Sequence, residues 1–71
     1  MQLILNSEEI IDVTSEEVIL YVNEEDRDNF YDKVSIANFS AILDMPYWWF
    51  NLSAIGVNGE VYKLTEIKEI K

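Results

Sequence analysis

Acidic side chains are concentrated in the stretch NEEDRDNFYDKV and could provide oxygen ligands for a divalent cation. The acids in question are Glu24, Asp26, Asp28 and Asp32. Their spacing does not fit a calcium-binding EF-hand loop, because counting from Glu24 places Asn29 where glycine is needed and Ser35 where a bidentate glutamate is needed. The chain also has no cysteine and no histidine, the usual zinc ligands. We therefore expect no specific metal site.

Nucleophilic catalysis lacks its usual components in this sequence. No histidine is present to activate a serine, and neither GxSxG nor SxxK occurs. The two glycines, Gly56 and Gly59, are too few for a glycine-rich phosphate loop. Carboxylates are plentiful, but nothing separates them into an acid and a base with different pKa values. We expect a noncatalytic protein without a cofactor.

The same acidic stretch favours a helix over Asn23–Val34, because Asn23 is a good N-cap and acidic residues follow it at the positive end of the helix dipole. At spacing four, Glu24, Asp28 and Asp32 would form one line, at a cost of roughly 0.2 to 0.5 kcal/mol per like-charge pair. A line of carboxylates about 5 to 6 Å apart approximates the charge repeat of a nucleic-acid strand and could occupy a basic groove on a protein. We include the neighbouring Glu25 in this surface. The simpler alternative is a solvated helix face.

The sequence YWWF raises the question of where two adjacent indoles can go. In a strand over Tyr47–Val57, Trp48 and Trp49 would project to opposite faces. We assign Trp48 to the core and Trp49 to the outer face near Tyr47. There Trp49 is covered by another segment or stacked on Lys68, or else Tyr47 and Trp49 form an exposed aromatic anchor for a partner. If YWWF instead ends a helix, both indoles could be core residues.

Asn58-Gly59 between apolar runs is the strongest local signal and predicts a type I′ hairpin with positive φ at both residues. This turn pairs Val57 with Glu60 and, at the far end, Trp49 with Lys68. One face of the hairpin is more apolar than the other, and we assign it to the core. It contains Trp48, Phe50, Leu52, Ala54, Val61 and Ile67.

The remaining elements follow from local patterns. Dense β-branched residues predict strands at Gln2–Leu5, Glu9–Val13 and Val18–Val22, although the capping-box spacing of Thr14 and Glu17 leaves a helix as an alternative for the third. In the helix over residues 23–34, the inner face would consist of Phe30, Tyr31 and Val34. We expect a break near Ser35, then a short helix or an irregular segment ending at Pro46.

Composition limits the classes of partner. The 71 residues have room for a single domain, and 14 acidic against 5 basic residues give a formal charge of −9. This charge repels nucleic acid and anionic membranes. No signal peptide or membrane span is evident, and the absence of cysteine fits a reducing compartment, so we expect a soluble, cytoplasmic protein.

Together these observations predict an α+β fold: a mostly antiparallel sheet of about five strands, one amphipathic helix (Asn23–Val34) on one face and a C-terminal hairpin. A small all-β barrel is the alternative. In size and charge the chain resembles the small acidic inhibitors made by bacteriophages and mobile elements. The expected function is to inhibit or regulate a nucleic-acid-handling protein that has a basic surface. The alternative is a structural protein that forms a homodimer through Tyr47 and Trp49.

Overall fold

The computed structural model describes residues 1–71 and has an α+β fold, as predicted, with two antiparallel sheets instead of one. Its strands are β1 (Gln2–Leu5), β2 (Ile10–Asp12), β3 (Glu17–Tyr21), β4 (Asp32–Ser35), β5 (Ala54–Val57), β6 (Glu60–Lys63) and β7 (Ile67–Ile70). The helices are α1 (Ile36–Leu43) and the short 3₁₀ helix η1 (Leu64–Glu66). The expectation of about five strands was too low, and the sheets do not close into the alternative barrel.

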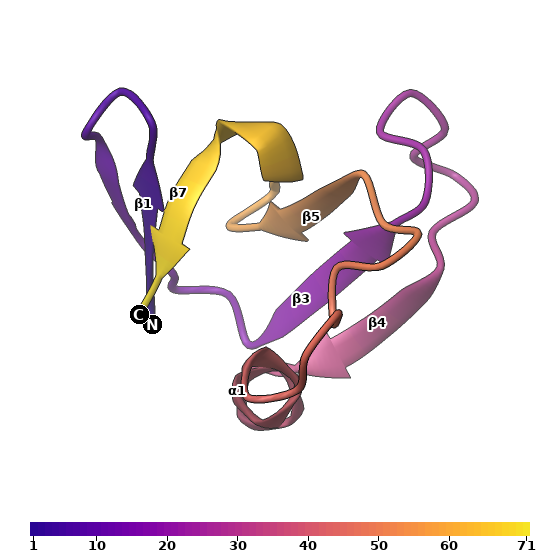
Figure 1. The fold of residues 1–71 in the computed structure, drawn as a ribbon. Helices are drawn as coiled ribbons and strands as arrows, with labels where there is room; N and C mark the ends of the chain where they lie inside the picture. Colours follow the sequence, from indigo (N-terminus) through magenta and orange to yellow (C-terminus); the bar gives the residue numbers. More distant parts are fainter.

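The three-stranded sheet brings the two ends of the chain together in the order β2-β1-β7. The Gln2 N–H donates to the Lys71 carbonyl at 2.8 Å, and the Lys71 N–H donates to the Gln2 carbonyl at 2.9 Å. Figure 1 shows the termini side by side at the end of this sheet. The predictions of β1, β2 and β3 as strands are confirmed, so the helical alternative for β3 was wrong.

The four-stranded sheet has the order β4-β3-β5-β6 and contains the predicted Asn-Gly hairpin. Asn58 has φ 55° and Gly59 φ 76°, the positive values that a type I′ turn requires. The register pairs Val57 with Glu60, as expected. The Asn58-Gly59 signal therefore predicted the turn and the pairs next to it correctly, whereas the longer hairpin predicted beyond them does not form.

Both sheets and α1 contribute to one hydrophobic core. Its fully enclosed residues are Leu3, Val18, Leu20, Phe39, Ile55 and Val57. The hairpin residues in this set, Ile55 and Val57, belong to the face opposite the predicted inner one, so the predicted inner face is correct only in part: Trp48, Leu52 and Ile67 do pack against the core. Phe50 is exposed, and Val61 does not pack on this cluster. Ala54 and Gly56, on the opposite face of β5, are also buried. The Tyr21 ring lies against Gly56, where an added Cβ would be 3.0 Å from Tyr21 Cε2.

The predicted helix over Asn23–Val34 is wrong. The segment forms consecutive turns and then strand β4, which pairs with β3. Asn23 Oδ1 accepts the Glu25 N–H at 3.0 Å, and Asn29 Nδ2 donates to Asp26 Oδ2 at 2.9 Å. Asn and Asp side chains that bond locally in this way compete with helical hydrogen bonds. The acidic residues therefore do not form a line on a helix face.

Helix α1 begins after the expected break at Ser35, where the short-helix alternative is correct. The Ser35 hydroxyl caps it by accepting the Asn38 N–H at 3.2 Å. Its buried residue, Phe39, packs into the core. The helix ends before Pro46. None of the helices combines the length and apolarity that crossing a membrane requires.

The strand predicted over Tyr47–Val57 is limited to Ala54–Val57. Before it, two turns follow one another: the Phe50 N–H donates to the Tyr47 carbonyl at 2.9 Å, and the Leu52 N–H donates to the Trp49 carbonyl at 3.0 Å. These turns replace the first part of the predicted strand, and β7 pairs with β1 instead, so the expected pairing of Trp49 with Lys68 does not occur.

Candidate protein-binding surface

The two tryptophans lie in the turns between α1 and β5 and have different surroundings. Trp48 is half-buried and meets Phe39 edge to face, with ring centroids 5.3 Å apart at 88°. Trp49 is 50% exposed and stands nearly perpendicular to Trp48, at 6.1 Å and 81°. The assignment of Trp48 to the core and of Trp49 to the outside is confirmed, although neither residue is in a strand.

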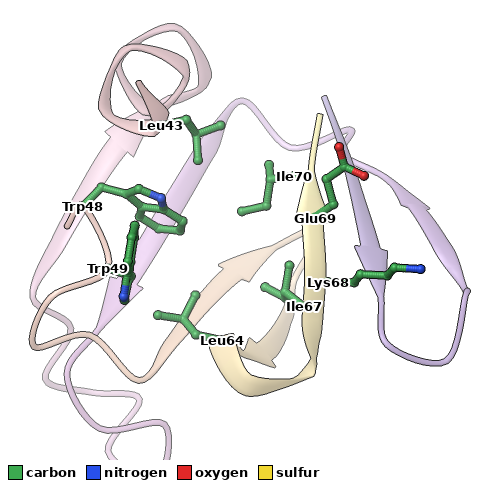
Figure 2. A pocket seen from close by; sticks show the side chains of 8 residues that line it. All are labelled: Leu43, Trp48, Trp49, Leu64, Ile67, Lys68, Glu69 and Ile70. Atoms are coloured by element: carbon green, nitrogen blue, oxygen red, sulfur yellow. The ribbon is translucent and has the colours of Figure 1, made fainter. Parts of the chain in front are cut away.

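Trp49 borders a groove between these turns and β7, which we call the indole groove and which Figure 2 shows. Its residues are Leu43, Trp48, Trp49, Leu64, Ile67, Lys68, Glu69 and Ile70. The Lys68 side chain points away from the indoles, and its Nζ pairs with Glu8 Oε1 at 2.9 Å. The expected stacking of Trp49 on Lys68 is therefore not formed. The Tyr47 ring remains beside Trp49, with centroids 6.1 Å apart.

A second concavity, of about 530 Å³, lies on the other side of the same turns. Its lining residues are Leu20, Tyr31, Asp32, Ile42, Tyr47, Trp48, Phe50, Asn51 and Leu52. We call it the aromatic hollow. Three of its rings are largely exposed: Tyr31 at 69%, Tyr47 at 70% and Phe50 at 71%. Exposed aromatic clusters of this kind are typical of protein-binding surfaces.

The position of Tyr31 depends on strand pairing and the position of Phe50 on turn geometry. The Tyr31 N–H donates to the Leu20 carbonyl at 2.7 Å, which holds Tyr31 at the end of β3. On the opposite side, Tyr47 and Asn51 both have φ 66°, so two left-handed residues set the path of the chain around Phe50. The hollow is thus formed by two loops that are distant in sequence.

Of the acidic residues predicted as a binding surface, Glu24, Glu25 and Asp28 lie in the β3–β4 loop, which leads into this hollow, and Asp32 is the first residue of β4. Glu25, Asp28 and Asp32 are exposed. The pKa of the Glu24 carboxyl is lowered, first by the nearby Ser53 hydroxyl, then by its own backbone N–H and by Lys63. Glu24 therefore remains negatively charged to lower pH than an ordinary glutamate.

The structure brings part of the predicted site together. Asp32 and Tyr47 line the same hollow, whereas Trp49 faces the indole groove. Tyr31 and Phe50 were missed as surface residues, because the helical wheel and the strand alternation had placed both in the core. The many Asn and Asp residues before Tyr31 are typical of turns. This signal argues against a helix there and could have corrected the placement of Tyr31 in the core.

The acidic side chains form no cluster of three or more that could hold a metal ion. Comparison with family models, with curated proteins and with solved structures returns no match to this chain. Its function therefore has to be inferred from its own residues, charge and geometry.

Proposed function

We propose that this protein is a noncatalytic binding module that attaches to the basic surface of a nucleic-acid-handling protein and inhibits or regulates it. The observation that carries this proposal is the junction of the acid-rich β3–β4 loop with the aromatic hollow. Tyr31 comes from the end of the loop and Asp32 from the start of β4, while Tyr47 and Phe50 come from the turns before β5. Such a surface combines apolar anchors with negative charge.

The distribution of charge supports an attraction to a basic partner. Glu8 is the only one of the 14 acidic residues that forms an ion pair, and its partner is Lys68. The other carboxylates are free to act on an approaching molecule, and an excess of one sign accelerates the encounter with a partner of the opposite sign. A surface that attracts basic grooves would compete with nucleic acid for them.

The backbone at Tyr47 gives a second argument. A tyrosine at φ 66° has a conformation that glycine adopts more easily, and such strain of about 1 to 3 kcal/mol is found mainly at functional sites. Its ring is mostly exposed, so packing into the core does not explain why a tyrosine is present at this strained position. A role for the ring at a protein interface would explain it.

Self-association through the exposed aromatic residues is the second candidate, because Met45, Tyr47 and Phe50 are all more than half exposed in one segment. It requires two molecules of charge −9 to approach each other. In the favoured proposal the protein is cytoplasmic, of bacteriophage or mobile-element origin, and monomeric until it meets its partner. Sedimentation at micromolar concentration separates the two candidates, since a stable dimer with shielded tryptophan fluorescence would support self-association.

The proposal is tested by capture from nuclease-treated lysate of the native host, with the protein immobilised. We expect the immobilised protein to capture a nucleic-acid-binding protein. Adding free double-stranded DNA or RNA should then release this captured protein, because both compete for its basic surface. Reversing Glu25 and Asp28 to lysine should abolish capture, because both charges belong to the loop at the hollow. The matched control reverses Glu16 and Glu60, which are exposed and do not line the hollow.

Loss of capture in both variants would show that net charge alone attracts the partner, which contradicts a specific loop surface. Capture that nucleic acid does not displace would contradict competition for a nucleic-acid site.

A further inference from the structure

The aromatic hollow contains a carboxylate but no basic residue among its lining residues. Asp32 Oδ1 accepts the Lys33 N–H at 2.8 Å, while Oδ2 has no hydrogen-bond partner within the protein. No lysine or arginine forms an ion pair with Asp32, since the chain's one ion pair joins Lys68 to Glu8. Asp32 is therefore available to a cation from another molecule.

The exposed rings around Asp32 offer the same kind of attraction. The face of an aromatic ring carries negative electrostatic potential and attracts a cation within about 6 Å of its centroid. The chain already uses this interaction elsewhere, where Lys33 Nζ lies 5.4 Å from the centroid of Phe30. Tyr31, Tyr47 and Phe50 have no such cation of their own.

The indole groove does not offer an equivalent site. Its lining residues include one acid and one base, Glu69 and Lys68, and the Lys68 ammonium is already paired. The electrostatic attraction of a cation is therefore weaker in the indole groove than in the aromatic hollow, which the acidic β3–β4 loop also borders. Charge complementarity therefore distinguishes the two concavities.

We propose that the aromatic hollow binds one arginine side chain of the basic partner, with the guanidinium stacked on the exposed rings and hydrogen-bonded to Asp32. Arginine suits this site because its planar guanidinium stacks on aromatic faces and also donates several hydrogen bonds to a carboxylate. This inference rests on the proposed function and names the chemical group of the partner that the surface recognises.

The test is an NMR titration of the isolated protein with Nα-acetyl-L-arginine amide. The aromatic and amide signals of Tyr31, Tyr47 and Phe50 should shift and saturate together. The uncharged probe Nα-acetyl-L-norleucine amide should shift them weakly. Equal shifts with both probes would overturn the proposal, as would shifts at the loop acids alone without the three rings.

Two variants assign the contributions. Asp32→Asn keeps an oxygen that can accept the Lys33 N–H but removes the charge, and should weaken arginine binding by about tenfold. Phe50→Leu removes an exposed ring and should also weaken it. Glu60→Gln, outside the hollow, serves as the control and should change the affinity by less than about twofold, as expected for a distant, screened charge. Unchanged spectra of the unbound variants would establish that each remains folded.

The two proposals can fail separately. If arginine does not bind but reversal of Glu25 and Asp28 still abolishes partner capture, the arginine site is wrong and the proposed function stands. If arginine binds but that reversal leaves capture intact, the proposed function is wrong.

Discussion

Tyr47 combines a strained backbone with an exposed side chain, and the two properties can be separated by substitution. Its φ of 66° favours glycine, whereas a β-branched residue is strongly disfavoured there. The ring lies 6.1 Å from that of Trp49 and lines the aromatic hollow. Stability and binding should therefore depend on different features of this one residue.

For this reason we expect Tyr47→Gly to have a free energy of unfolding within about 1 kcal/mol of the wild-type value, because relief of strain offsets the added freedom of the unfolded chain and the lost ring contact. Tyr47→Val should be less stable than Tyr47→Gly by roughly 1 to 3 kcal/mol. Both variants should bind arginine more weakly. Urea denaturation followed by tryptophan fluorescence measures the first effect and NMR titration the second. Equal stability of the two variants would argue against strain at this position.

At the scale of elements, Asn58 connects the β5–β6 turn to the segment between β2 and β3, which belong to different sheets. Its Oδ1 accepts the backbone N–H groups of Thr14 and Ser15 at 2.7 and 3.0 Å, and its Nδ2 donates to the Asp12 carbonyl at 2.7 Å. The side chain of a turn residue therefore helps to hold the two sheets together.

Asn58→Gly keeps the positive φ but removes these three bonds and a fourth, from the Thr14 hydroxyl to Oδ1 at 3.1 Å, each worth about 0.5 to 1.5 kcal/mol. We expect the variant to lose roughly 2 to 6 kcal/mol of unfolding free energy, measured by urea denaturation. Gly59→Asn is the control, since a Cβ at Gly59 meets no atom within 4 Å and asparagine tolerates its φ. A larger loss for Gly59→Asn than for Asn58→Gly would show that the backbone of the turn matters more than these bonds.

The elements that the sequence predicted correctly are those with a local cause. The strands β1, β2 and β3 follow from β-branched runs, and the hairpin follows from Asn58 and Gly59. The helix over Asn23–Val34 failed because charge and capping patterns do not report the local bonds that Asn23 and Asp26 form. Most of the strand predicted over Tyr47–Val57 does not form, because a run of aromatic residues does not reveal that Tyr47 has a left-handed backbone.

The candidate site shows the same division. Asp32, Tyr47 and Trp49 were identified as surface residues from charge and residue type. Their neighbours Tyr31 and Phe50 depended on the faces of elements that do not form. The aromatic hollow itself joins loops distant in sequence, and no local pattern encodes that meeting.

At the scale of the whole molecule, the formal charge of −9 with a single ion pair opposes folding and favours a basic partner. Self-repulsion between exposed carboxylates destabilises a compact state, and salt screens it over a Debye length of about 10 Å at 0.1 M ionic strength. Salt also weakens the Glu8–Lys68 pair, but an exposed pair contributes only about 0 to 1 kcal/mol. The repulsion among many carboxylates should dominate.

We therefore expect the melting temperature to rise when sodium chloride is increased from low to physiological and higher concentration, by several degrees if about 1 kcal/mol of repulsion is screened. Arginine and partner binding should weaken over the same range, because salt screens that attraction as well. A variant with Glu25→Gln, Asp28→Asn and Glu60→Gln, which removes three negative charges, should show a smaller rise. A melting temperature that falls with salt would mean that attractive contacts outweigh the repulsion, and the carboxylates would then already be compensated within the protein instead of being free to attract a partner.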